Sequence, residues 1–247
     1  MLKLMKYEFR KTMFSKAVIL ILTAVAELAY LVGVFAKIED TMGLGIAGLF
    51  MCAMIGIFYI GIESLIVFHK DLNTKQSYML FLTPNSSYRI LGAKVLENGI
   101  AIFVAGAFFT VLAVLDATIG ILYIGGLKEF LDILGEVIKN IQINIDIQPE
   151  HILMTFLAGL ASWIMMIVTG YLAIVLSATV LAGKKFSGFA SFLLYLVISW
   201  IGSWLMSLVP EMQNFYVQFG LMIAVAFAII FVMYAVTGWI MEKKLSV

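Results

Sequence analysis

Residues 215–241 read FYVQFGLMIAVAFAIIFVMYAVTGWIM, an apolar run in which no side chain carries a charge. A helix rises about 1.5 Å per residue, so this run is long enough to cross the ~30 Å hydrocarbon core of a bilayer. It is too long for a membrane-barrel strand, which needs only about 9–11 residues. Five other runs predict five more membrane-spanning helices, near residues 17–37, 44–68, 94–123, 152–182 and 186–209.

The composition of the whole chain supports this interpretation. Of its 247 residues, 63% are hydrophobic and only 13% are charged, whereas soluble domains are about 45–50% apolar. No Pro- or Ser-rich linker divides the chain, so we expect residues 1–247 to form a single all-α polytopic membrane domain. The net charge is only +1 and no basic groove with interleaved aromatic residues is present, so we expect membrane lipid and no nucleic acid among its partners.

The distribution of Lys and Arg predicts the orientation of the spans, because cytoplasmic loops carry an excess of these residues. If the N-terminus is cytoplasmic, only Lys37, Lys128 and Lys139 of the 16 basic residues lie outside. We therefore expect both termini in the cytoplasm. The basic residues expected inside are Lys3, Lys6, Arg10, Lys11, Lys16, Lys70, Lys75, Arg89, Lys94, Lys184, Lys185, Lys243 and Lys244.

Three segments outside the spans have a recognisable pattern. Residues 1–16 predict an amphipathic helix in the inner interface, with Leu2, Met5, Phe9 and Met13 at helical spacing; the alternative is a basic flank with no other task. Residues 37–43, KIEDTMG, predict a tight outer turn. Residues 124–151 predict an outer amphipathic helix, because LKEFLDILGEVIKNI places its apolar residues on one stripe.

Residues that could carry enzyme chemistry are sparse. Cys52 is the only cysteine, and His69 and His151 are expected on opposite sides of the membrane, so they cannot share a metal ion. The stretch ATVLAGKK at 178–185 lacks the first Gly and the final Ser or Thr of a nucleotide-binding loop. We therefore expect no catalytic residue, no metal site and no cofactor in this chain.

Two carboxyl groups fall within the apolar runs. Glu27 is near the middle of the first span, where a charge costs about 2.5–3.5 kcal/mol on insertion scales, so it should face the bundle interior, pair or be protonated. Thr23, Tyr30 and Leu31 share its face. Glu63 is closer to the cytoplasmic end and can reach the interface. Each could be a polar spot on a transport path or a buried group that sets helix packing.

The fifth span has a seam of small and polar residues. Such residues let helices approach closely and form hydrogen bonds between helices. The seam indicates helix packing within the chain or across a dimer, and alternatively the lining of a cavity. Its members recur at steps of four: Ser187, Ser191, Tyr195, Ser199, Ser203 and Ser207.

The loop between the second and third spans, within FHKDLNTKQSYMLFLTPNSSYRILGAKVLEN at 68–98, is more than a polar connection. Asp71, Asn73 or Thr74 can cap a short helix, and Pro84 predicts a turn because the residue before a proline avoids helix. The helix has an apolar surface that water would not favour, so it is buried against the bundle or bound to a partner. That surface consists of Tyr78, Met79, Phe81 and Leu82.

This loop resembles the first cytoplasmic loop of the permease subunits of type-2 ATP-binding-cassette (ABC) exporters. That loop has a charged pair, a Gly-Thr, a run similar to LELLLTTP, a Ser-Arg and a hydrophobic-Gly-Lys motif. The chain has Lys70-Asp71, Asn73-Thr74, SYMLFLTP, NSSYR and ILGAK, and departs from the pattern at Asn73 and Gln76. The matching positions are Leu80, Leu82, Thr83, Pro84, Ser86, Gly92 and Lys94.

The resemblance implies a bacterial inner-membrane exporter, similar to permeases of peptide-antibiotic immunity and drug efflux. Two permease chains would form a homo- or heterodimer, and two separate ATPase subunits would bind ATP and Mg²⁺. Residues 72–82 would form a coupling helix within the cytoplasmic loop 69–93. Its contact residues would be Tyr78, Phe81 and Leu82 before Pro84, and its rim charges would be Lys70, Asp71, Lys75 and Arg89.

Two other functions fit the same sequence. An ATP-independent secondary transporter or channel would use Glu27 and Glu63 as ion sites, and would have broken helices near mid-membrane. Glycines at 43, 45, 48, 56 and 61 permit such a break. A sensory or assembly subunit would contact an ATPase without carrying a substrate.

Overall fold

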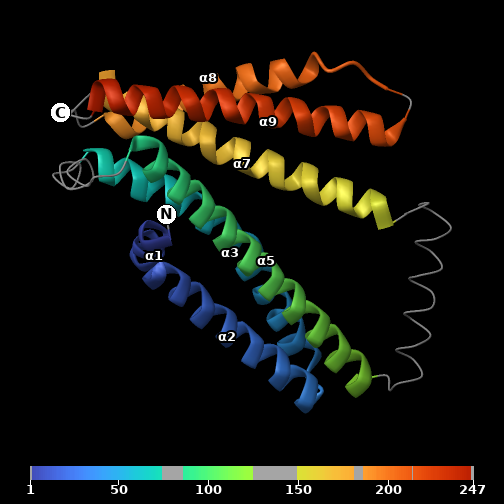
Figure 1. Ribbon diagram of the computed structural model, residues 1–247. Coiled ribbons are helices and arrows are strands. Elements are labelled where there is room, and N and C mark those ends of the chain that lie inside the picture. The colour runs from blue at the N-terminus through green and yellow to red at the C-terminus, as the bar shows by residue number, and fades with distance from the viewer. Residues whose placement is uncertain (1, 74–85, 125–148, 181–185, 213, 246–247) are drawn as a thin grey trace. The chain divides into compact units, whose positions relative to one another are not determined.

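The computed structural model describes residues 2–73, 86–124, 149–180, 186–212 and 214–245, and all regular structure in these residues is helical (Figure 1). Six of the helices are long and apolar enough to cross a membrane, as the sequence predicts. The elements are α1 (Leu2–Lys11), α2 (Met13–Ala36), α3 (Glu39–Asn73), α5 (Ser87–Ile124), α7 (Pro149–Val180), α8 (Ser187–Ser207), α9 (Phe215–Ile240) and a π-helical turn, η1 (Met241–Leu245).

Several helices extend beyond the apolar runs that predict them. The second run was expected to span residues 44–68, but α3 has 35 residues and begins at Glu39. Its first turn contains Glu39 and Asp40, whose negative charges favour a helix N-terminus. The expected coupling helix lies largely outside the described residues, since 74–85 are not described. The same holds for residues 125–148, which include most of the expected outer helix.

The chain forms two compact units, and α1, α3 and α5 each contribute to both. Unit 1 comprises Met1–Phe9, Ile62–Gly99 and Pro149–Val247, and unit 2 comprises Arg10–Gly61 and Ile100–Gln148.

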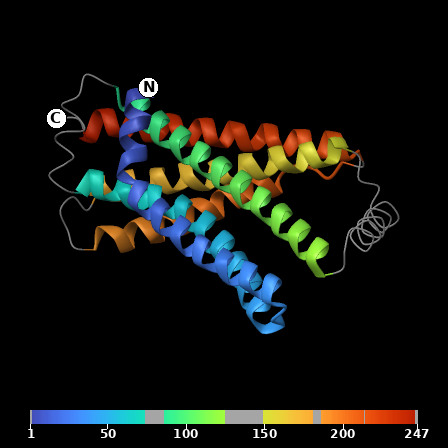
Figure 2. The same ribbon diagram turned by 90° about the horizontal axis from the view of Figure 1, so that it is seen from below.

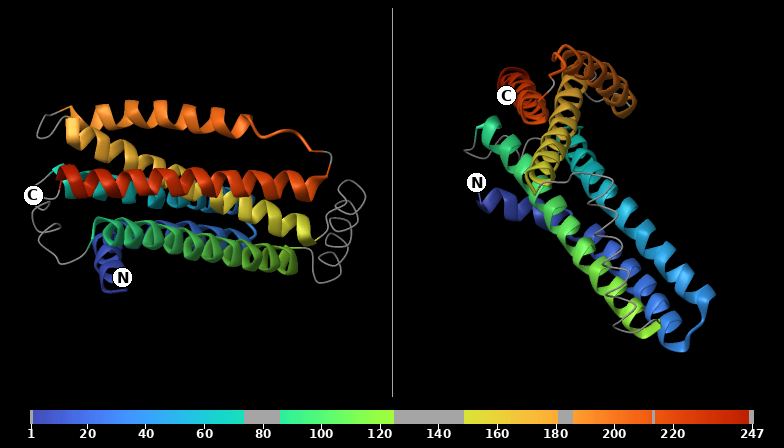
Figure 3. Two further views of the ribbon diagram at one scale, coloured as in Figure 1. Left: turned by 45° about the horizontal axis from the view of Figure 1, so that its top comes forward. Right: turned by 90° about the vertical axis from the view of Figure 1, so that its right-hand side faces the viewer.

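Helix α7 forms the centre of unit 1. It lies alongside both α8 and α9 (Figure 3), and 61% of its apolar window is buried, against 11% for α8. Tyr171 and Val175 are fully buried and pack with Phe68 of α3 and Leu91 of α5. The serine seam of α8 contributes only partly to this packing, because Ser187 and Ser191 are buried whereas the seam is exposed at its other end.

In unit 2, α2 and α3 form a hairpin, which Figure 2 shows in side-by-side ribbons. The chain turns at Lys37, whose φ of 56° is left-handed, and the Ile38 N–H donates to the Gly33 carbonyl at 2.9 Å. A tight turn is thus present at Lys37 and Ile38, but residues 39–43, which were predicted to belong to it, form the first turn of α3. A Cβ on Gly45 would lie 2.4 Å from the Cα of Tyr30, so a glycine is required for this close approach.

The same helix bears on the alternative transporter architecture. Helix α3 is continuous from Glu39 to Asn73, so its glycines do not produce a break near mid-membrane. Gly45 and Gly48 instead face Tyr30 and Ala26 of α2. Here glycine provides room for a neighbouring helix rather than freedom for the backbone.

Candidate functional site

Unit 2 contains a pair of carboxyl groups from two apolar helices. Glu27 of α2 and Asp116 of α5 are in hydrogen-bonding contact through their side chains. Helical spacing places Tyr30 one turn after Glu27, and the Tyr30 hydroxyl donates to the backbone carbonyl of Asp116 at 2.5 Å. The structure therefore supports the prediction that Glu27 faces other helices, and it adds a partner that sequence reasoning did not identify.

Small residues make room for this arrangement. A Cβ on Gly120 would lie 2.5 Å from the Tyr30 hydroxyl oxygen. Tyr30 is only 4% exposed, so its phenol is held between α2 and α5. The Tyr30 hydrogen bond fixes the turn of α5 that carries Asp116.

The pair retains unused hydrogen-bonding capacity. Among the described residues, Glu27 Oε2 and Asp116 Oδ1 are buried and have no hydrogen-bond partner. Asp116 is 9% exposed. A buried polar atom without a partner costs free energy, and each such atom in a folded protein calls for an explanation such as a missing ion, ligand or water.

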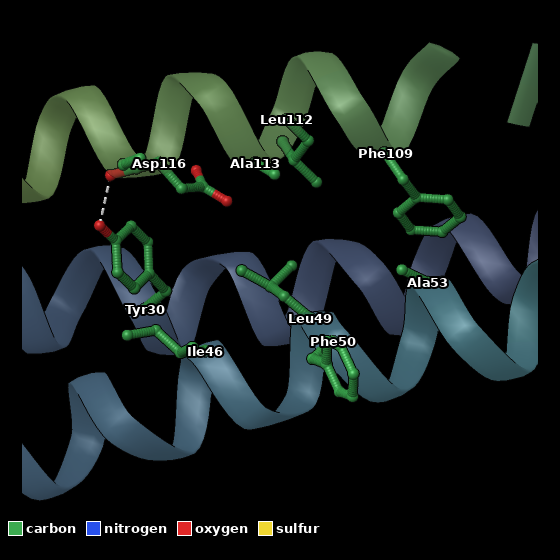
Figure 4. Close-up of a pocket in the computed structure, with 10 residues that line it drawn as sticks. Tyr30, Ile46, Leu49, Phe50, Ala53, Phe109, Leu112, Ala113 and Asp116 are labelled. Atoms are coloured by element: carbon green, nitrogen blue, oxygen red, sulfur yellow. Dashed lines mark hydrogen bonds between the residues drawn. The ribbon is translucent and has the colours of Figure 1, made fainter. Parts of the chain in front are cut away.

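Asp116 also lines a cavity of about 340 Å³ (Figure 4). The cavity lies between α2, α3 and α5, and its wall is otherwise apolar apart from Tyr30. Small-molecule sites typically have a mostly apolar wall with a few placed polar groups and about 300–1,000 Å³ of space. The lining residues are Tyr30, Ile46, Leu49, Phe50, Ala53, Phe109, Leu112, Ala113, Asp116 and Ala117.

Unit 1 contains a second polar site, centred on Lys94. Its ammonium group lies 2.7 Å from Glu8 Oε2 of α1 and 2.7 Å from Asp71 Oδ2 of α3. The exposed fractions of the three side chains are 2%, 8% and 4%. The ring centroid of Phe68 lies 5.6 Å from the same ammonium nitrogen. Lys94 therefore joins three helices inside the protein.

Further buried polar groups belong to the same unit. The hydroxyls of Ser64 and Tyr171 are 2.5 Å apart, and Trp163 Nε1 donates to Asn98 Oδ1 at 3.2 Å. Glu63 is 6% exposed, which corrects the expectation that its side chain reaches the interface. Most of these partners are far apart in the sequence, so the polar groups fix how α3, α5 and α7 pack.

The residues predicted for ATPase coupling have different locations. Lys70 and Arg89 are exposed. Asp71 is wrong in that role and as a helix cap, because it is buried inside α3 and paired with Lys94. Of the suggested pathway residues in α8, Ser199 is half-buried and Ser203 is exposed. Lys75, Tyr78, Phe81, Leu82 and Pro84 lie outside the described residues.

The described part of helix α1 buries an acidic side chain. Glu8 is 6% exposed, whereas Phe9, on the apolar stripe predicted to face the membrane interface, is 44% exposed. A signal for Asp116 was present in the sequence, since it is an isolated acid within an apolar run, and such residues are functional candidates by default. No comparable local signal exists for the Glu8–Lys94 pair.

Comparison with known proteins found no match: neither a protein-family model, nor a curated protein, nor a solved structure is significantly similar to this chain.

Proposed function

We propose that this chain is the membrane-spanning permease subunit of an ABC exporter, driven by separate ATPase subunits that bind ATP and Mg²⁺. The proposal rests on the motif at 68–98 together with six helices of spanning character. The structural observation that supports the proposal is the buried Lys94 site. It joins Asp71 and Lys94, which lie in the two helices that flank the loop of this motif.

The Lys94 site gives the loop a mechanical connection to the helices. The loop leaves α3 just after Asp71 and enters α5 seven residues before Lys94. Since Lys94 binds Asp71, the two helices that flank the loop are joined close to it, and Glu8 adds α1 to the same junction. Packed protein interiors transmit displacement because they are dense and hardly compressible. A force on the loop would therefore move α1, α3 and α5 together.

In this proposal the loop faces the cytoplasm of a bacterium, and both termini lie on that side. A helix at 72–82 would bind a groove of the ATPase through Tyr78, Phe81 and Leu82. Closure of the ATPase pair on ATP would then switch two permease chains between inward- and outward-facing states by rigid-body motion. The exported substrate would be hydrophobic or amphipathic, such as a peptide, drug or lipid.

One observation favours a second candidate, an ATP-independent secondary transporter. Paired intramembrane carboxyl groups such as Glu27 and Asp116 are typical of ion-coupled pathways. Such transporters usually bind ions at broken helices, and the unbroken α3 does not favour this mechanism. Transport driven by an ion gradient in the absence of any ATPase would select the second candidate.

The test of the exporter proposal is association with an ATPase. The chain is co-expressed with each ABC ATPase subunit of the same genome that has no membrane domain of its own, and the complex is purified through a tag on the chain. We expect the double variant Phe81→Asp/Leu82→Asp to lose the ATPase while keeping its own helicity. The matched control is Phe186→Asp, which changes a 76% exposed phenylalanine outside the motif and should retain the ATPase.

Two results would contradict the proposal. One is a wild-type chain that purifies without any of these ATPase subunits under conditions that preserve its fold. The other is equal recovery of the ATPase with the double variant and the wild type.

A further inference from the structure

We propose that Glu27 and Asp116 bind the ammonium group of an amphipathic cation, whose apolar part occupies the cavity between α2, α3 and α5. Binding itself requires only unit 2 of this chain, whereas the assignment of the cation as the exported substrate rests on the function proposed above.

The first argument is the charge of the site. Two carboxyl groups approach each other in an apolar surrounding, and no lysine or arginine is among the groups acting on Glu27 in the described part of the chain. One of two hydrogen-bonded carboxyl groups must hold the proton, so the pair carries one negative charge when its second member is ionised, and a cation beside it stabilises that charge. The buried Oδ1 of Asp116, which has no partner among the described residues, can face the positive charge of an ammonium group.

The second argument is the shape and chemistry of the cavity. Its wall carries one carboxyl group, from Asp116, and otherwise aliphatic and aromatic side chains (Figure 4). Tyr30, Phe50 and Phe109 lie in this wall, and aromatic rings attract ammonium groups through their faces. A molecule with one positive end and one apolar body matches both features, whereas an anion or a purely polar solute does not.

A metal ion fits the site less well than an ammonium group. Ca²⁺ takes about 6–8 oxygen ligands, and Mg²⁺ requires about six in near-octahedral geometry. Within the described ranges, no group of three or more His, Cys, Asp or Glu side chains is arranged to hold a metal ion. The pair supplies two carboxyl groups beside an apolar cavity, so an organic cation is the better match.

The test uses benzyltrimethylammonium and its neutral carbon isostere, neopentylbenzene. The quaternary ammonium has no acidic proton, so its binding cannot be proton exchange. Affinities for the purified chain in nanodiscs are measured by saturation-transfer NMR, without any ATPase. We expect the wild type to bind the ammonium probe, and Asp116→Asn to weaken this binding by about tenfold or more through loss of the opposite charge in an apolar surrounding. Binding of the neutral probe should be unchanged.

Two further variants separate recognition from folding. Asp40→Asn removes an exposed acid at the start of α3, away from the cavity wall, and should bind both probes normally. Ala113→Leu keeps both carboxyl groups but fills the cavity, and should weaken both probes.

The proposal is overturned if the wild type binds neither probe, or if the two probes bind equally and Asp116→Asn changes neither. The carboxyl pair would then hold a proton only. This outcome is independent of the ATPase test. A chain that binds the ammonium probe but no ATPase supports the binding site and contradicts the exporter function. A chain that binds an ATPase but not the ammonium probe supports the exporter function and contradicts the binding site.

Discussion

Replacement of Lys94 by Met is the most informative perturbation of unit 1. Methionine preserves most of the side-chain volume against Phe68 but removes the ammonium group that lies 2.7 Å from both Glu8 and Asp71. Both carboxylates then lose this cation while they remain buried. Removal of one partner from a buried ion pair costs about 3–5 kcal/mol, because the remaining charge stays desolvated.

The assay is thermal unfolding of the purified chain in detergent, followed by circular dichroism at constant pH and detergent concentration. For a chain of this size, each kcal/mol shifts the midpoint by about 2–4 °C, so we expect Lys94→Met to lower it by about 6–20 °C. The matched control is Arg89→Met in the same helix. Arg89 is exposed, and its replacement should change stability by no more than about 0.5 kcal/mol.

A triple variant tests the cause of the loss. Glu8→Gln and Asp71→Asn remove the two carboxylates, so their combination with Lys94→Met should recover part of the lost stability. A midpoint for Lys94→Met within about 2 °C of the wild type would refute the reasoning, because it would show that the buried ammonium stabilises nothing. A triple variant less stable than Lys94→Met would also contradict it.

Two further predictions concern the α2–α3 hairpin of unit 2. Gly45→Ala should lose about 1–3 kcal/mol in the same unfolding assay, because its Cβ would lie 2.4 Å from Tyr30 Cα. Gly43→Ala, which meets nothing within 4 Å, should be neutral or gain up to about 1 kcal/mol, and equal effects of the two changes would contradict the close approach. Lys37→Gly should raise the stability by about 0.5–1 kcal/mol, because Lys37 has a φ of 56°; a loss of stability would show that the Lys37 side chain has another role.

The six helices could be predicted because the signal for each is local. Length and apolar composition decide whether a segment can span a bilayer, and both are read from one stretch of sequence. Helix ends were predicted less well. The charged residues Glu39 and Asp71 were expected outside the second span, but neither stops a helix, so α3 includes both.

The polar sites could not be predicted to the same extent, because each depends on packing between distant segments. Glu8 and Lys94 are separated by 86 positions, as are Tyr30 and Asp116. Helical periodicity placed Phe9 on the apolar stripe of an interfacial helix and gave no partner for Glu8. The structure buries Glu8, whose carboxylate pairs with Lys94.

The central proposal is that separate ATPase subunits drive this chain. The most direct measurement is the rate of ATP hydrolysis by the ABC ATPase subunits of the same genome that have no membrane domain of their own, in proteoliposomes with and without the chain. We predict that the wild-type chain changes this rate several-fold and that Phe81→Asp/Leu82→Asp removes the change, whereas Phe186→Asp preserves it. Rates that are the same with and without the chain for all of these ATPase subunits would contradict the proposal.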